Sequence, residues 1–145
     1  MNLKNRRTFL GSLQAFAAAL LAGPRAFAQA AAGKPKFGPK IHNGLIFISG
    51  QGANDHGPVQ GLDIGSHTRK TLNNVKRQVE AAGGTMDSIL QLTVYLATLE
   101  DYEAMNKVYR TYFPNGGPAR STVAVAGVPG HSLLEINCIA AVVKP

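Results

Sequence analysis

The chain has 145 residues, 45% of them hydrophobic, with 15 Lys and Arg against 8 Asp and Glu. It is too apolar for a disordered protein, and its length fits one domain. The single cysteine excludes an intramolecular disulfide and a cysteine-based zinc cluster.

The first 28 residues carry four basic side chains and no acidic one. A basic start, an apolar run over 9–23 and the small-x-small triplet Ala26-Phe27-Ala28 predict a cleavable signal peptide. Arg6-Arg7 followed by Thr-Phe-Leu resembles a twin-arginine export signal, so we expect a periplasmic protein. The alternative is an uncleaved amphipathic helix.

The remaining 117 residues hold 11 basic and 8 acidic side chains, a net charge of +3. They contain no apolar run that could serve as a membrane anchor.

Residues 29–36 are rich in Ala, Gly and Lys and are interpreted as a flexible lead-in to a domain over 37–145. Two short β-branched runs, 40–42 and 45–49, flank Asn43-Gly44, which predicts a hairpin with a type I′ turn. Residues 50–61 contain five Gly and Pro residues and predict a loop, with a short strand near Val59.

Apolar side chains at three- and four-residue spacing predict a helix from Asp63 to Ala82, ended by Gly83-Gly84. The apolar run 89–96 is typical of a strand that is buried on both faces. Thr98 and Asp101 resemble a capping box, which predicts a second helix from there to Tyr112.

Two further strands are predicted over 120–128 and 133–143, joined as a hairpin at Pro129-Gly130-His131. The order of elements indicates an α+β two-layer sandwich, a mixed sheet with two helices on one face. Such a sheet has exposed edges and a small core, so a homo-oligomer is expected.

Few residues carry recognisable chemistry. Nucleotide, zinc-protease and serine-hydrolase motifs are absent, and the four histidines lack the spacing of metal ligands, so no metal is expected. Cys138 lies within a predicted strand and is interpreted as a buried structural thiol. Arg120 begins a strand directly after a Gly-Gly-Pro-Ala turn, where its planar guanidinium could bind a carboxylate, although an ordinary surface arginine is the alternative.

Six segments follow one another at the spacings of the RidA (YjgF) family. They are Phe47-Ile-Ser-Gly-Gln51, Asn73-Asn-Val-Lys76, Val94-Tyr-Leu96, Met105-Asn-Lys-Val-Tyr109, Pro118-Ala-Arg-Ser-Thr122 and Glu135-Ile-Asn-Cys-Ile-Ala140. The resemblance extends from about Phe37 to Val143. It implies a chorismate-mutase-like fold, a homotrimer with clefts between subunits, and deamination of reactive enamines or imines without metal or organic cofactor.

The resemblance also implies roles for individual residues. Arg120 corresponds to the arginine that binds the substrate carboxylate, Ser49 and Gly50 to a Ser-Gly whose backbone lines the pocket, and Asn106 to an asparagine of the cleft. Phe37 occupies a position where many members have Tyr, so a hydroxyl contact is missing there.

Asn137 is the main departure, because deaminating members usually have Glu at this position. An asparagine can hold a water molecule but cannot accept its proton. Glu135 is two residues away, so on a strand it faces the same side and could act instead.

These residues leave three functions open. The first is a periplasmic deaminase that hydrolyses 2-imino acids to 2-keto acids and ammonia. The second is a non-catalytic trimer that binds small carboxylates. The third is an RNA- or protein-interacting role, which the small mature charge and the export signal disfavour, so no nucleic-acid partner is expected.

Overall fold

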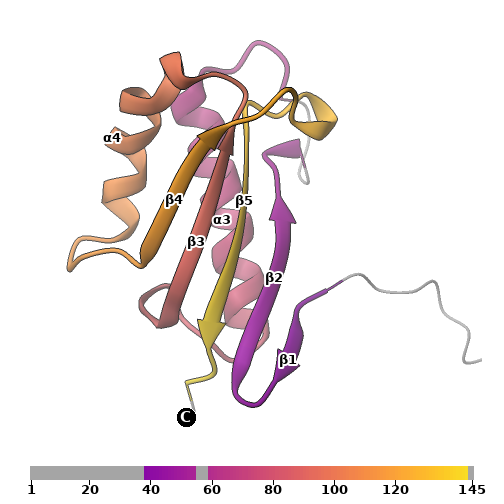
Figure 1. Ribbon diagram of the computed structural model, residues 1–145, viewed down its shortest axis with the longest axis vertical. Coiled ribbons are helices and arrows are strands. Elements are labelled where there is room, and N and C mark those ends of the chain that lie inside the picture. Colours follow the sequence, from indigo (N-terminus) through magenta and orange to yellow (C-terminus); the bar gives the residue numbers. More distant parts are fainter. Residues whose placement is uncertain (1–37, 55–58, 144–145) are drawn as a thin grey trace, which may run out of the picture. The chain divides into compact units, whose positions relative to one another are not determined.

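The computed structural model describes residues 38–54 and 59–143. The predicted signal peptide, the lead-in and Phe37 lie outside these residues. The described chain forms a five-stranded sheet in the order β1-β2-β5-β3-β4 (Figure 1). The strands are β1 (Lys40–His42), β2 (Leu45–Gln51), β3 (Ile89–Leu96), β4 (Ala119–Ala124) and β5 (Leu134–Ala141); the α-helices are α3 (Ile64–Ala81) and α4 (Tyr102–Tyr112).

Local sequence determines the β1–β2 hairpin and the limits of α3, as predicted. Asn43 and Gly44 adopt φ values of 49° and 76°, the positive φ at both central residues that a type I′ turn requires. Asp63 caps α3 by accepting a hydrogen bond from the Ser66 N–H at 2.6 Å. Hydrogen bonds from Ser66 lower the pKa of the Asp63 carboxyl. The helix ends at Ala81 with Ala82 as its C-cap, and Gly83 follows with a φ of 85° that suits glycine.

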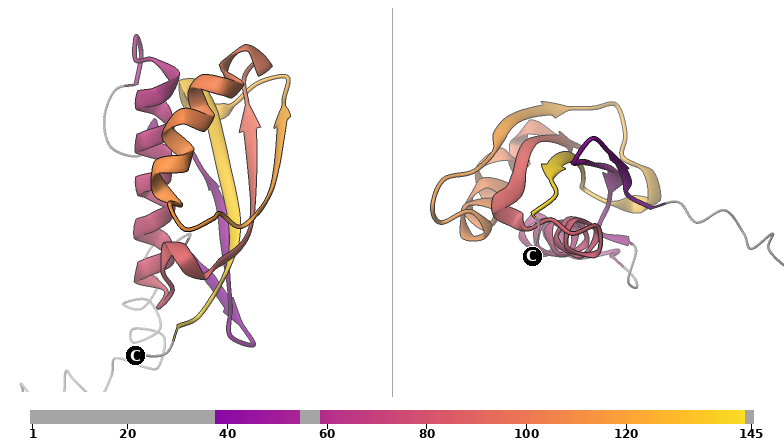
Figure 2. Two further views of the ribbon diagram at one scale, coloured as in Figure 1. Left: turned by 90° about the vertical axis from the view of Figure 1, so that its left-hand side faces the viewer. Right: turned by 90° about the horizontal axis from the view of Figure 1, so that it is seen from below.

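Both described α-helices cover one face of the sheet, which confirms the predicted two-layer sandwich (Figure 2, left). The core lies between the layers, where alternate residues of β5 and β3 meet the apolar stripe of α3. Its largest fully buried hydrophobic side chains are Ile46, Leu72, Leu92, Leu96, Met105, Leu134 and Ile136. The opposite face has no covering element among the described residues.

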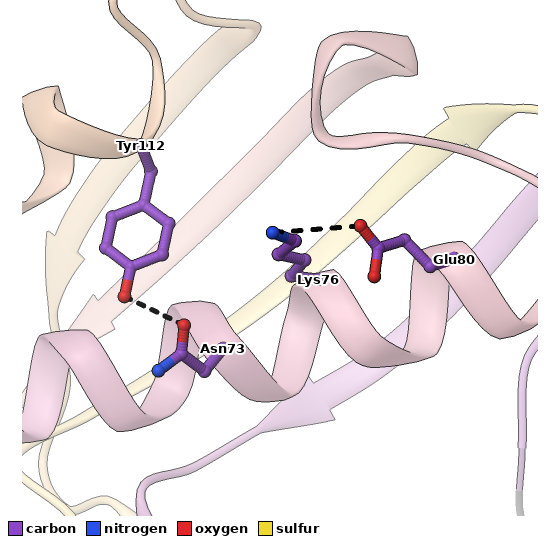
Figure 3. Close-up of polar contacts among 4 residues, drawn as sticks. All are labelled: Asn73, Lys76, Glu80 and Tyr112. Atoms are coloured by element: carbon purple, nitrogen blue, oxygen red, sulfur yellow. Dashed lines mark hydrogen bonds and ion pairs between the residues drawn. The ribbon is translucent and has the colours of Figure 1, made fainter.

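Polar contacts join the two helices on their outer side. The Tyr112 hydroxyl donates to Asn73 Oδ1 at 2.9 Å, which links α4 to α3 (Figure 3). One helical turn further along α3, Lys76 and Glu80 form an exposed i,i+4 ion pair at 3.8 Å, a geometry that contributes little to stability.

The predicted hairpin between the last two strands is wrong. β4 pairs with β3 in parallel, and β5 lies between β2 and β3, so β4 and β5 are not neighbours. The parallel pair follows from the helical crossover through α4, whereas a tight turn can join only antiparallel strands. The segment 125–133 therefore crosses over the end of β3 instead of forming a hairpin.

Three smaller predictions are also corrected. β3 is buried on one face only within the chain, because Gln91 is exposed on its other face. Thr98 caps a 3-10 turn, Leu99–Asp101, by accepting from the Glu100 N–H, and α4 follows that turn. Val59 lies in a turn region rather than in a strand.

Candidate functional site

The strand register separates the candidate residues into two faces of the sheet. Arg120 is opposite Leu92, which is opposite Cys138, and these three residues form one row across β4, β3 and β5. Directly opposed residues share a face, and Leu92 and Cys138 are buried in the core. Arg120 therefore faces the helices. The adjacent row pairs Thr93 with Asn137 and faces the uncovered side.

Arg120 has an aromatic neighbour rather than an acidic one. Its guanidinium carbon lies 4.3 Å from the centroid of the Tyr109 ring of α4, within the range of a cation–π interaction. Its Nη1 atom is buried and has no hydrogen-bond partner. Within the described residues, Arg120 forms no ion pair. The Tyr109 ring thus contacts the planar face of the guanidinium, while the buried Nη1 on its edge makes no hydrogen bond.

Unsatisfied polar atoms gather on this side of β4. The described residues contain four buried side-chain polar atoms without a partner, and three of them belong to Arg120, Tyr109 and Thr122. Thr122 is two residues after Arg120 on β4 and so shares its face. Buried polar groups are normally hydrogen-bonded, so a cluster of exceptions indicates a place where a ligand or water completes the set.

Tyr109 belongs to the buried stripe of α4, one turn after Asn106. Both side chains are almost fully buried, at 6% and 2% exposure. Burial raises the pKa of the Tyr109 hydroxyl, and the nearby Arg120 charge opposes that rise. α4 runs antiparallel to β4. Two strand residues span about 6.6 Å and three helix residues about 4.5 Å, so Thr122 is displaced from Arg120 in the same direction as Asn106 is from Tyr109. We call Asn106, Tyr109, Arg120 and Thr122 the arginine half-site.

A second group lies where β2 meets β5. The β2–β5 register shifts between Ile48 and Gln51, which places a bulge at Ser49 and Gly50. The buried Gln51 side chain donates to the carbonyl oxygens of Ser49 and Gly50, each at 3.1 Å, and so fixes the bulge. The carboxylate of Glu135 occupies the space that a side chain on Gly50 would need, so glycine is required for this close approach.

Glu135 also borders a shallow hollow. It lies opposite Tyr95 of β3, and both residues line a depression of about 170 Å³ formed with the segment 125–129. This depression is mostly apolar and contains one carboxylate. We call Ser49, Gly50, Tyr95 and Glu135 the glutamate half-site.

Asn137 lies on the same face as Glu135 but borders a different hollow. That hollow, of about 210 Å³, lies over the centre of the sheet and is lined in part by Phe47, Gln91, Thr93 and Asn137. Of the two candidate side chains on β5, Glu135 is therefore the one beside Ser49 and Gly50.

Buried polar contacts hold the loops around the glutamate half-site. His67 of α3 accepts a hydrogen bond from the Leu133 N–H at Nδ1, 3.1 Å away, so its Nε2 carries the proton and donates to the Val59 carbonyl. Ser132 accepts from the Ala53 N–H at 3.0 Å. His67 thus has a structural position, which agrees with its lack of metal-ligand spacing.

Cys138 is buried on the helix-facing side of β5. Desolvation raises the pKa of its thiol to about 12, which makes it unreactive as a nucleophile at neutral pH.

No group of His, Cys, Asp and Glu suited to a metal ion occurs among residues 38–54 and 59–143. In the same part of the chain, neither helix has the length and apolarity to cross a bilayer.

Helix and strand spacing assigns Asn106 to the same half-site as Arg120, whereas Ser49, Gly50 and Glu135 belong to the other. The two half-sites lie on opposite faces of the same sheet. Phe37 lies outside the described residues. Sequence reasoning did not single out Tyr109 or Thr122 for a functional role. The two-residue spacing from Arg120 would have placed Thr122 beside it, but no sequence pattern indicates that the Tyr109 ring lies against a guanidinium.

The described residues thus form a two-layer α+β fold, with an arginine that has no acidic partner among them on an edge strand and a carboxylate beside a glycine bulge. The family model of endoribonuclease L-PSP matches residues 27–142. The chain therefore belongs to this family, which is the RidA (YjgF) family that its motifs resemble.

Individual relatives agree with this assignment. A RutC family protein of Pyrococcus horikoshii is 40% identical over 98 residues, covering 66% of this chain and 78% of that protein. The chloroplastic Reactive Intermediate Deaminase A of Arabidopsis thaliana is 35% identical, covering 68% of this chain and 54% of that protein. The structure of E. coli TdcF with bound serine is 32% identical with a TM-score of 0.66, covering 76% of this chain and 90% of that one.

Proposed function

We propose that this protein is an enamine/imine deaminase that hydrolyses 2-imino acids to 2-keto acids and ammonia. The observation that carries the proposal is Arg120: among the described residues, its buried Nη1 has no hydrogen-bond partner and its guanidinium has no acidic partner. The family includes a relative named as a reactive intermediate deaminase. A structural relative holds serine, a small amino acid with a carboxylate.

For imine hydrolysis the protein mainly has to orient the substrate and the attacking water. Arg120 would bind the substrate carboxylate, a charge-assisted contact that contributes about 1.5–3 kcal/mol. A water molecule then adds to the C=N carbon, and its proton passes to the substrate nitrogen through a carboxylate. The hydroxyl proton of the tetrahedral adduct then passes to the same nitrogen, the C=O bond forms, and the C–N bond breaks so that ammonia leaves. Holding the reactants in line can supply much of the acceleration.

We assign the proton-transferring carboxylate to Glu135 rather than to the position of Asn137. Glu135 can accept a proton and contacts Gly50 of the predicted pocket, whereas Asn137 cannot and borders another hollow. Arg120 and Glu135 face opposite sides of one sheet. We therefore propose that the working site is composite, with the arginine half-site of one copy facing the glutamate half-site of the next in a homotrimer.

The direct test supplies imines in situ with an amino-acid oxidase and measures the release of keto acid and ammonia. We expect Arg120→Ala to reduce kcat/KM about 10- to 100-fold, the equivalent of one charge-assisted contact. Arg110→Ala, an exposed arginine of α4, is the matched control and should leave the rate unchanged. An equal rate for Arg120→Ala and the wild type would exclude this site.

A second candidate is a non-catalytic carboxylate binder, which the separation of the two half-sites within one chain favours. The arginine half-site needs no second copy to hold a carboxylate. Calorimetric binding of 2-oxobutanoate without turnover of imines would support this alternative, and a monomer that binds as tightly as the assembled protein would support it further.

We also propose that the protein is exported to the periplasm by its N-terminal segment, on the basis of Arg6-Arg7 and Ala26-Phe27-Ala28. Cell fractionation of the wild type and of an Arg6→Lys, Arg7→Lys double variant tests this. Loss of the processed form in the variant is the expected result. Cytoplasmic location of the wild-type protein would contradict it.

A further inference from the structure

A partly buried arginine normally requires an acidic partner, and Arg120 has none among the described residues. The contact that replaces it is the face of the Tyr109 ring, 4.3 Å from the guanidinium carbon. A ring face attracts a cation without using any of its N–H groups. A carboxylate in the same place would hold the arginine through those groups and compete with the substrate for them.

Tyr109 is itself held rigidly. Its side chain is only 6% exposed, and its ring lies 4.8 Å from that of Phe113, one helical turn further, with an interplanar angle of 37°. Its hydroxyl lies close to Gly117, where a Cβ atom would approach it to 3.3 Å. A buried ring packed on two sides offers the guanidinium a fixed surface.

We propose that Tyr109 is a positioning residue for carboxylate recognition: its ring face orients Arg120 and leaves the N–H edge of the guanidinium free for the substrate. This inference rests on the proposed function, since it assumes that Arg120 is the carboxylate-binding group. It assigns to Tyr109 no contact with the reacting atoms.

The test measures the affinity for 2-oxobutanoate by calorimetry, and KM and kcat for imine hydrolysis, in the full assembled protein. Tyr109→Phe keeps the ring and lacks only the hydroxyl, so its loss of affinity should be much smaller than that of Tyr109→Leu. Tyr109→Leu removes the ring, and we expect it to weaken binding and raise KM by about tenfold while kcat changes much less, because the loss is in binding shared by ground and transition states. Tyr112→Leu, a half-buried tyrosine of the same helix whose hydroxyl bonds to Asn73 on α3, is the control and should leave affinity unchanged.

Because Tyr109→Leu could fail to fold, a second series changes the ring electrostatics at position 109 without changing the size of the side chain much. Phenylalanine and its mono- to trifluorinated analogues at position 109 have nearly the same size but progressively weaker ring quadrupoles. We expect affinity to fall with each added fluorine. Equal affinities across the series, or an equal loss in Tyr109→Phe and Tyr109→Leu, would overturn the inference.

Failure of this inference can be distinguished from failure of the proposed function. If Arg120→Ala abolishes binding of 2-oxobutanoate and Tyr109→Leu does not weaken it, only the role of Tyr109 is wrong. If Arg120→Ala binds as well as the wild type, the carboxylate site itself is wrong, and the role of Tyr109 is overturned with it.

Discussion

The two faces of the sheet differ in the surroundings of their charged side chains. On the helix-covered face, Arg120 lies against an aromatic ring with one of its donors buried and unsatisfied. On the uncovered face, Glu135 lies half-buried against Gly50 at the edge of an open hollow. Because the sheet separates the two charges, neither neutralises the other, and each remains available to a ligand or to a second copy of the chain.

The largest expected effect concerns the stability of the covered face. Leu92→Ala truncates a fully buried residue directly opposite Arg120, and we expect it to lower the free energy of unfolding by about 2–5 kcal/mol. Leu99→Ala, at 59% exposure, should change it by less than about 0.5 kcal/mol. Urea denaturation at one protein concentration measures both. Similar values for the two variants would show that the core does not lie between the sheet and the helices.

The next largest effect distinguishes the roles of Glu135 and Asn137 on the uncovered face. Glu135→Gln removes the proton acceptor while keeping its size, and we expect kcat for imine hydrolysis to fall about 100-fold or more. Asn137→Asp places a carboxylate over the other hollow and should leave kcat close to that of the wild type. The opposite pattern would move the catalytic position to residue 137.

A smaller effect is expected where Gly50 meets Glu135. Gly50→Ala would place a methyl group in the space of the Glu135 carboxylate, and the displaced carboxylate should reduce kcat about tenfold. Gly38→Ala is the matched control, because a Cβ atom at that position meets no atom within 4 Å. Steady-state kinetics that are unaffected in Gly50→Ala would show that the position of Glu135 does not matter for turnover.

The smallest effect concerns Cys138 on the covered face. Burial raises the pKa of its thiol from 9.0 to about 12, so the folded state favours the neutral form. Its contribution to stability is therefore complete below pH 9 and is lost as the pH rises toward 12. At pH 8 we expect a thiol reagent to label the native protein far more slowly than the urea-unfolded chain. An introduced exposed thiol, Thr111→Cys, should react quickly in the native state, and equally fast labelling of native Cys138 would contradict its burial.

Much of the candidate site was predictable from the sequence, but its geometry was not. The position of Arg120 after a turn and its family motif indicated a carboxylate-binding group, and residue alternation on β5 correctly placed Glu135 and Asn137 on one face. Which of the two borders the Gly50 bulge depends on the β2–β5 register. That register involves residues more than 80 positions apart, for which no local pattern exists.

By itself the sequence determined the local elements: the Asn43-Gly44 turn, the cap of α3 at Asp63 and the apolar stripes of both helices, since each depends on neighbours within a few residues. Only the tertiary structure decided that β5 inserts between β2 and β3, that Tyr109 supports Arg120, and that the arginine and the glutamate face opposite sides. These features arise from packing between distant segments, where burial and hydrogen bonding across the whole sheet select one arrangement among several that the local sequence allows.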